Sequence, residues 1–298
     1  MKRYGDEFGF VHLVKSEIDR GGQGVVYRTS DPNVAVKLVL DAAGNEIPAG
    51  HVAHRLSRLR SLPLPKNLNL SMPAAVLTDT AGYVMRLLDD MVSLRHFEPT
   101  MGSKMQDDGA VMPVWLSGLP EADAMKLAHY AKTGGLARRL LALYKASATL
   151  ARLHAAGLVY GDISPSNVFV SQDRDSREVW LIDADNLRFE TASARSAIYT
   201  PGFGAPEVVQ GLSPGTQRND SHAFAAMAYW ILTLVHPFVG DYVESGGRLI
   251  GRTIGQMSRK MSIPLIYRRM PTRASCRGCK IYRTQEITLT KGYRDRWF

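Results

Sequence analysis

Apolar residues in the first ninety positions form short, β-branched runs that Gly, Asp and Pro separate. Three of these runs predict successive antiparallel strands, namely Val11–Val14, Val25–Arg28 and Val34–Leu40. Leucines at helical spacing with arginines between them predict an amphipathic helix over 53–62. Two more strands are predicted at Ala74–Thr78 and Gly82–Leu88.

The pattern then becomes helical. An Ala/Leu-rich stretch predicts a helix over Leu136–Ala156 that ends at Gly157, and a hairpin follows with strands Val168–Ser171 and Val179–Ile182. The most apolar run, Ala223–Val235, is shorter than the roughly 20 residues that cross a bilayer, so it predicts a buried helix. The expected fold class is α+β, with a small β-rich part followed by a larger helical part.

Composition adds a charge imbalance to this picture. The 298 residues are 45% hydrophobic and carry a formal net charge of +9, which fits a globular chain of one bilobed or two separate domains. Residues 246–298 hold 13 basic and two acidic residues, whereas residues 1–245 hold 24 basic and 26 acidic ones. The near-neutral body argues against nucleic-acid binding, beyond non-specific contacts by the basic tail.

The N-terminus is charged and has no apolar signal core, so no membrane attachment is expected. The two cysteines, Cys276 and Cys279, form one CxxC, which is half of a zinc site at most. A chain with so few cysteines fits a reducing cytoplasm, which is the expected location.

Four local motifs carry candidate chemistry, and each alone is also typical of an ordinary turn or edge strand. The first is a glycine-rich turn with Gly21, Gly22 and Gly24, whose backbone could approach phosphate closely. The second is Lys37, which lies within an apolar strand and therefore needs an anion. The others are the loop Asp162–Asn167 and the strand end at Asp183.

In this order the four motifs resemble the signature set of protein kinases, from about Val11 to Gly240. The stretch Ala205-Pro206-Glu207 extends the resemblance, which is to bacterial kinases of eukaryotic type. Asp220 stands where this family has the aspartate that braces the catalytic loop, so it is expected to brace the loop around Asp162. The resemblance implies a bilobed kinase-like fold with lobes at 1–88 and 89–245, followed by a basic tail at 246–298 of uncertain structure. YGDISPSN, LIDADN and YTPGFGAPE also resemble kinases encoded beside von Willebrand-A and phosphatase partners.

The resemblance implies a role for each matching residue. ATP would lie under the glycine turn, and Lys37 would bind its α- and β-phosphates. Asp162 would accept or orient the proton of the substrate hydroxyl. Mg²⁺ would be held by Asn167 and Asp183. The carboxylate partner of Lys37 would lie between Lys37 and the next strands, where Asp41 and Glu46 are the acidic residues, and Glu46 is chosen. The residues expected to line the nucleotide site are Val26, Ala35, Met85 and Leu87.

The chain also departs from the kinase pattern. Asp19 replaces the first glycine, Ser164 replaces a lysine, and Asp183-Ala184-Asp185 replaces Asp-Phe-Gly. Tyr160-Gly161 replaces His-Arg, which removes the arginine that binds an activation-loop phosphate, so no switch of that type is expected. Glu207 is expected to pair with an arginine.

Three functions therefore remain open. The first is a Mg-ATP-dependent Ser/Thr protein kinase, whose partners would be ATP, a protein substrate, and a cognate phosphatase and von Willebrand-A protein. The second is a pseudokinase or ATP-binding scaffold, which the departures at Asp19 and Ser164 favour. The third is a small-molecule phosphotransferase, which Gly161-Asp162 favours and Ala205-Pro206-Glu207 opposes.

The tail differs from the body in composition, because residues 246–298 contain one Ala and no Val. It is either a basic binding or linker segment, or the product of a reading frame broken near Gly246. The second explanation predicts that a frame shift after this point restores an Ala/Glu/Leu-rich helical continuation. Sequencing and translating the locus tests this, and alternative frames filled with stop codons would refute it.

Overall fold

The computed structural model describes residues 2–21, 24–51, 53–99, 113–190 and 199–238. The chain divides into two units, Met1–Lys260 and Met261–Phe298, and all described residues belong to the first. The basic segment predicted from 246 onward therefore lies outside the described residues.

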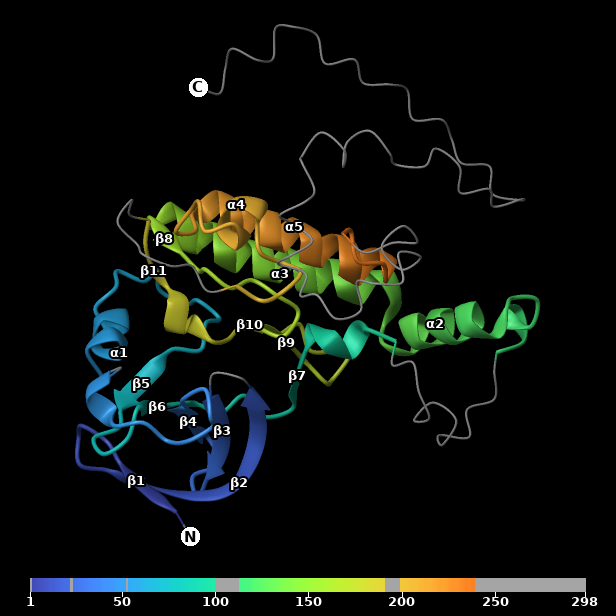
Figure 1. Cartoon of the computed structure of the whole chain (residues 1–298). Coiled ribbons are helices and arrows are strands. Elements are labelled where there is room, and N and C mark those ends of the chain that lie inside the picture. Colours follow the sequence, from blue (N-terminus) through green and yellow to red (C-terminus); the bar gives the residue numbers. More distant parts are fainter. Residues whose placement is uncertain (1, 22–23, 52, 100–112, 191–198, 239–298) are drawn as a thin grey trace, which may run out of the picture. The chain divides into compact units, whose positions relative to one another are not determined.

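A six-stranded antiparallel sheet forms the N-terminal part of the fold (Figure 1). Its strands are β1 (Arg3–Gly5), β2 (Val11–Gly21), β3 (Gly24–Thr29), β4 (Val34–Val39), β5 (Pro73–Val76) and β6 (Gly82–Arg86). They lie in the order β1-β2-β3-β4-β6-β5. Strands β2, β3 and β4 are the predicted meander, and the predicted helix is α1 (Ala53–Arg60), preceded by the short turn η1 (Ala49–His51).

The register of this sheet separates two faces of different character. Val25, Leu38, Val36 and Val84 are buried and form one apolar core cluster. The alternate residues face the other way, because successive side chains of a strand point to opposite faces. Those residues include Lys37, and α1 packs its buried Leu56 and Leu59 into a second core that is continuous with the helical part.

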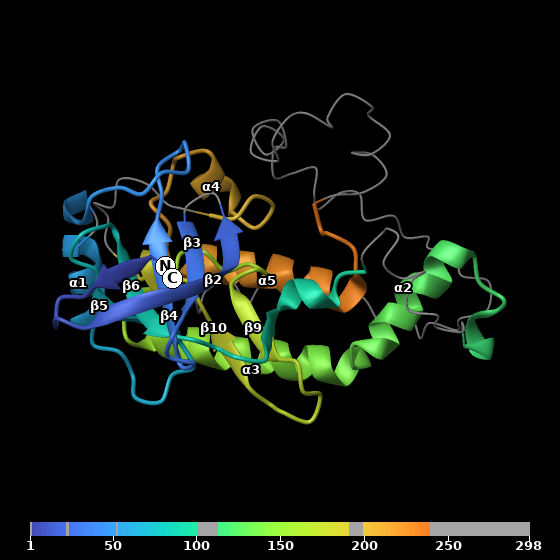
Figure 2. The same ribbon diagram turned by 90° about the horizontal axis from the view of Figure 1, so that it is seen from below.

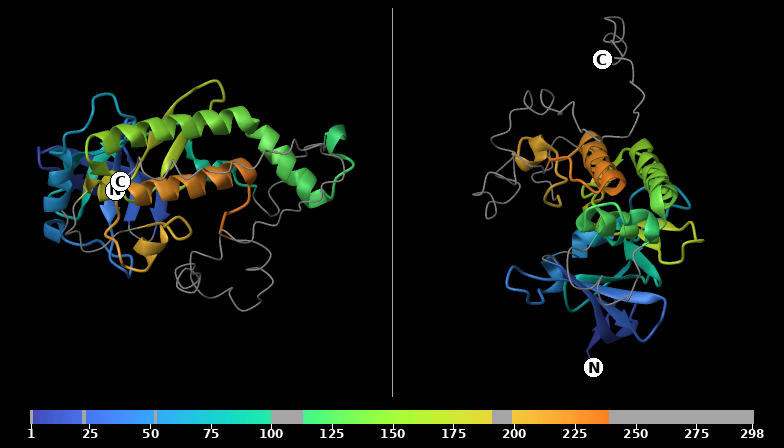
Figure 3. Two further views of the ribbon diagram at one scale, coloured as in Figure 1. Left: turned by 90° about the horizontal axis from the view of Figure 1, so that it is seen from above. Right: turned by 90° about the vertical axis from the view of Figure 1, so that its right-hand side faces the viewer.

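The second part combines helices with two small sheets. The helices are α2 (Glu121–Lys132), α3 (Gly135–Ala155), α4 (Pro206–Val209) and α5 (Gln217–Thr233), with the short turns η2 (Leu94–Phe97), η4 (Val114–Leu116) and η5 (Ala184–Asn186). The strands are β7 (Met91–Ser93), β8 (Leu158–Val159), β9 (Val168–Ser171), β10 (Val179–Leu181) and β11 (Arg188–Phe189). Helices α3 and α5 run side by side (Figures 2 and 3).

The predicted α+β fold class, with a β-rich part followed by a helical part, is confirmed. The predicted hairpin is present, because β9 and β10 pair antiparallel. Helix α5 begins six residues before the predicted Ala223, since a capping box between Thr216 and Asn219 starts it in a polar turn. Helix α2 buries only Ala124, so it left no apolar period to detect. Among the described helices, none is long and apolar enough to span a bilayer.

A buried arginine joins the ends of four elements in the helical part. Arg139 on α3 has no exposed surface. Burial lowers the pKa of Arg139 to about 10, so it remains charged at neutral pH. Its guanidinium lies 3.8 Å from the ring centre of Tyr130. It donates to the carbonyls of Phe97, Tyr130, Gly135 and Ile231 and to the hydroxyl of Thr133.

We predict that Arg139→Met destabilises the fold by about 2–4 kcal/mol, because the substitution leaves several buried carbonyls without donors. Urea unfolding followed by circular dichroism measures the change. Arg177→Met is the matched control, because Arg177 is exposed in the turn between β9 and β10, and it should shift stability by less than about 0.5 kcal/mol. Equal effects of the two substitutions would contradict the tethering role of Arg139.

Candidate functional site

The side chains predicted to bind nucleotide share one face of the N-terminal sheet. Val26 is paired with Lys37 across β3 and β4, and Ala35 is paired with Met85 across β4 and β6. Directly paired residues project to the same side of a sheet, as do residues two apart on one strand. The register therefore brings these four residues together, and it adds Tyr83, which is paired with Lys37.

The glycine turn closes one end of this face. Gly21 pairs with Gly24 at the junction of β2 and β3, and Gly22 lies outside the described residues. A Cβ at Gly24 would lie 2.3 Å from the carbonyl oxygen of Leu38, so only glycine permits this approach of β3 to β4. Asp19, which stands at the first glycine of the kinase pattern, is exposed.

The opposite end of the face contacts the β3–β4 turn through backbone and β10 through a side chain. Leu87 donates its backbone N–H to the carbonyl of Asn33 at 2.8 Å. The backbone N–H of Leu87 is therefore already used, and its carbonyl and side chain remain to line a ligand. The guanidinium of Arg86 lies 5.0 Å from the ring centre of Trp180 on β10.

Lys37 is paired with carboxylates that follow β10. Its ammonium donates to Asp183 and, at 3.0 Å, to Asp185. Burial alone disfavours the charged form, but the carboxylates of Asp185 and Asp183 outweigh it, so the pKa of Lys37 is raised. The side chain of Lys37 is 9% exposed, which makes this a largely desolvated ion cluster.

The prediction that Glu46 partners Lys37 is wrong. Glu46 accepts hydrogen bonds from Lys2 at 2.7 Å and from Tyr4 at 2.9 Å. It forms a β-bridge with Leu40 in the loop after β4, so it is directed to the β1 edge of the sheet before α1 begins. The sequence AHRLSRLR of α1 contains no acidic residue, so this helix supplies no carboxylate to Lys37.

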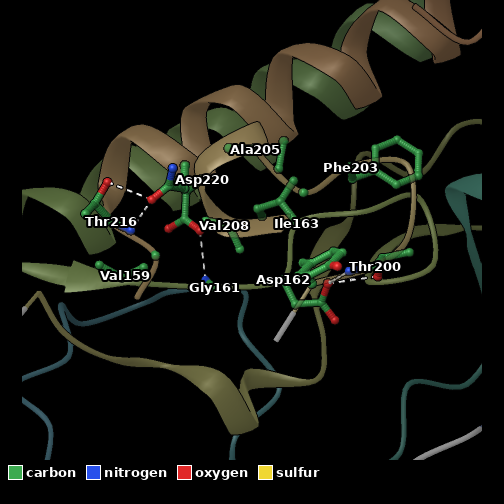
Figure 4. A pocket seen from close by; sticks show the side chains of 15 residues that line it. Val159, Gly161, Asp162, Ile163, Thr200, Phe203, Ala205, Val208, Thr216 and Asp220 are labelled. Atoms are coloured by element: carbon green, nitrogen blue, oxygen red, sulfur yellow. Dashed lines mark hydrogen bonds between the residues drawn. The ribbon is translucent and has the colours of Figure 1, made fainter. Parts of the chain in front are cut away.

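The loop 160–167 is held by a buried carboxylate. Asp220 on α5 is 2% exposed and accepts the backbone N–H of Tyr160 at 2.7 Å. It also accepts the backbone N–H of Gly161 at 2.8 Å (Figure 4). The Asp220 oxygen that accepts from Tyr160 also lies 3.0 Å from Nε2 of His154. The predicted bracing of this loop by Asp220 is confirmed.

An arginine from elsewhere occupies the space beside Gly161. Gly161 has a φ of +91°, and a Cβ there would lie 3.1 Å from Nη1 of Arg188. Arg188 lies on β11 and donates to the carbonyls of Pro214 and Gly215. Arg188 thus lies beside position 161, where the kinase pattern has an arginine, and its guanidinium binds backbone carbonyls.

Asp162 lies at the centre of a second group of contacts. One of its oxygens accepts from the backbone N–H of Thr200 at 2.7 Å and from the Thr200 hydroxyl at 2.8 Å (Figure 4). Its other oxygen accepts from the Asn167 amide at 3.1 Å. Burial raises the pKa of Asp162, and the hydrogen bonds from Thr200 and Asn167 partly oppose the shift.

Asn167 and Asp183 are brought close by the backbone. The N–H of Ile182 donates to the carbonyl of Asn167 at 3.0 Å, and Asp183 follows with a left-handed φ of +60°. The amide nitrogen of Asn167 is bound to Asp162, so its oxygen is the atom suited to a cation. Amide and carboxylate oxygens are ligands that Mg²⁺ prefers, and phosphate oxygens commonly complete such a site.

A small pocket lies behind Asp162, between the segment 199–205 and α5 (Figure 4). Phe203 in this segment stacks on Trp230 with ring centres 5.5 Å apart. Glu207 at the start of α4 accepts from the amide of Asn219. Among the described residues no arginine pairs with Glu207, and the contact shown for its carboxylate is with Asn219 on α5.

Sequence reasoning missed Tyr83 and the role of Asp185. Asp185 lies two residues from the predicted site residue Asp183, and the sequence marks it only as a departure from the Asp-Phe-Gly pattern. Tyr83 carried no signal of its own, because an aromatic residue within a strand is ordinary.

Comparison with known proteins agrees with this geometry. Residues 123–197 match the model of the lipopolysaccharide kinase (Kdo/WaaP) family. The serine/threonine-protein kinase pkn2 of Myxococcus xanthus is 29% identical over 110 residues, which are 35% of this chain and 13% of that protein. The DNA damage-responsive serine/threonine-protein kinase RqkA of Deinococcus radiodurans is 31% identical over 114 residues, which are 38% of this chain and 17% of that protein.

A third relative is the serine/threonine-protein kinase PknL of Mycobacterium tuberculosis, 32% identical over 96 residues, which are 31% of this chain and 23% of that protein. The chain thus spans less than a quarter of the length of each of these relatives. The matches support a kinase-like phosphotransferase, a class that generally uses ATP. Together with the bracing by Asp220 and the sheet register, they support a member of the protein-kinase-like superfamily.

Proposed function

We propose that this protein is a Mg-ATP-dependent protein kinase that transfers the γ-phosphoryl group to Ser or Thr hydroxyls. The observation that carries the proposal is the double hydrogen bond from Thr200 to Asp162. It fixes the segment leading to Ala205-Pro206-Glu207 beside the carboxylate that would meet the acceptor. An acceptor peptide could lie along this segment with its hydroxyl at Asp162.

The proposed roles of the residues follow from their environment. Asp162 is held by three donors and has a raised pKa, which suits a group that orients a hydroxyl and receives its proton. Lys37 would bind the nucleotide phosphates as a point charge. Asn167 and Asp183 would hold Mg²⁺, which when bound neutralises charge on the phosphates. The sheet face around Ala35 would receive the base.

Two alternatives have specific support. Ser164 has no exposed surface, and its hydroxyl is buried without a partner, so the position of the missing lysine supplies no positive charge to the transferred group. This favours a slow or inactive kinase. The match to the lipopolysaccharide kinase family favours a carbohydrate hydroxyl as acceptor in place of a peptide.

Transfer of label from γ-³²P-ATP with Mg²⁺ tests the proposed function. With generic protein acceptors we expect labelled Ser and Thr, and Asp162→Asn should lower the rate about 10²–10⁴-fold because it removes the proton acceptor. Asp173→Asn, in the exposed turn after β9, is the matched control and should keep the rate. Label on lipopolysaccharide or an aminoglycoside alone would favour the second alternative, and nucleotide binding without any transfer would favour the first.

The bond from Thr200 predicts a shift in pH dependence. Thr200→Val removes the hydroxyl donor that lowers the pKa of Asp162, so that pKa should rise further and the acid limb of the rate profile should move to higher pH. Thr200→Ser keeps the donor and should leave the limb in place. Rates measured from pH 5 to 9 give the answer, and coincident acid limbs for the Val and Ser variants would show that this bond does not tune Asp162.

A further inference from the structure

Lys37 faces two carboxylates whose environments differ. The side chain of Asp183 is 41% exposed, whereas that of Asp185 is 12% exposed. An exposed carboxylate remains accessible to a cation and to phosphate. A buried one beside a buried ammonium is a permanent partner, because separating the two would leave a desolvated charge.

Asp185 is itself held in place by a second donor. The Tyr83 hydroxyl donates to one oxygen of Asp185 at 2.6 Å, while Lys37 binds the other oxygen at 3.0 Å. Tyr83 is 2% exposed and lies directly opposite Lys37 in the β4–β6 ladder. Burial, followed by the charge of Asp185, raises the pKa of Tyr83 well above its usual value, so the hydroxyl keeps its proton.

The backbone explains how Asp183 and Asp185 both reach Lys37. Asp183 adopts a left-handed conformation and is followed by the short turn η5. Ala184 within this turn is 1% exposed and belongs to the helical core. The core side chain anchors the turn, and the residues on either side of it are directed to the sheet.

We propose that Asp185, oriented by Tyr83, is the residue that positions Lys37 for nucleotide, in the place that a helix glutamate holds in other kinases. This inference rests on the proposed function. It accounts for the lack of acidic residues in α1 and for the outward position of Glu46. Asp183 is then left to hold the cation, and the position of Lys37 depends on η5 and β6 and not on α1.

Labelling of Lys37 tests the positioning without any nucleotide. Acetylation with acetic anhydride at one fixed pH, read by mass spectrometry, reports how readily the Lys37 amine meets the reagent in the folded protein. Because Asp185 binds the buried ammonium of Lys37 at 3.0 Å, Asp185→Asn should release the side chain and raise the labelling rate of Lys37. Glu46→Gln, on the carboxylate that binds Lys2, is the control and should leave it unchanged.

Nucleotide affinity tests the consequence for binding. Titration of Mg-ATP by calorimetry should show about 10- to 100-fold weaker binding for Asp185→Asn, and weaker binding for Tyr83→Phe, since a hydrogen-bonded charge is lost or loosened. Glu46→Gln should bind as the wild type does. The Tyr83→Phe variant keeps the proposal testable if Asp185→Asn does not fold, as judged by circular dichroism.

The outcomes separate the positioning role from the proposed function. An unchanged labelling rate of Lys37 in Asp185→Asn, or an equal change in Glu46→Gln, would overturn the role of Asp185. If the labelling rate and the affinities change as expected but wild type phosphorylates no protein, the Ser/Thr kinase function fails and the positioning stands. If wild type transfers phosphate to protein, but Asp185→Asn and Tyr83→Phe both bind ATP with wild-type affinity, the positioning role alone is overturned.

Discussion

The buried carboxylate of Asp220 fixes the geometry of the loop 160–167. It accepts two successive backbone N–H groups, from Tyr160 and Gly161, and it projects from α5, a helix whose start is set by a capping box. Because the two donors precede Asp162 directly, the carboxylate of Asp162 has little freedom relative to α5. Hydrogen bonds from Thr200 and Asn167 then hold the carboxylate of Asp162. The position of this group of side chains therefore depends on the buried carboxylate of Asp220.

The second half of the site is a sheet face that carries a buried cation. In the proposed function its apolar members, such as Ala35 and Val26, would provide surface for a base, and Lys37 is the buried charged residue among them. A buried ammonium requires a fixed anion, and the structure provides it from the turn after β10 through Asp185. The same ion pair joins the N-terminal sheet to the segment after β10, so the cost of burying Lys37 is offset by a contact that also sets the spacing of the site.

The strands and the main helices could be predicted because their apolar periods are local properties of the sequence. Strand β2 was predicted only as far as Val14, since its later residues are exposed and follow no alternation of burial. Glu46 was chosen as a partner by elimination among acidic residues near Lys37 in sequence. Asp185 lies 148 residues from Lys37, and no local pattern reports a pairing over that separation. The missed residues are therefore those whose roles arise from tertiary contact.

The replacement of the arginine before Asp162 bears on how the following segment is ordered. In kinases with that arginine, an added phosphate supplies the anion that pulls the segment into place. Here Arg188 lies beside Gly161 and binds two carbonyls, of Pro214 and Gly215, while Thr200 binds Asp162 directly. All partners in these contacts belong to the unmodified chain, so both attachments form without a modification. This arrangement supports the prediction that no phosphate switch of the usual type operates.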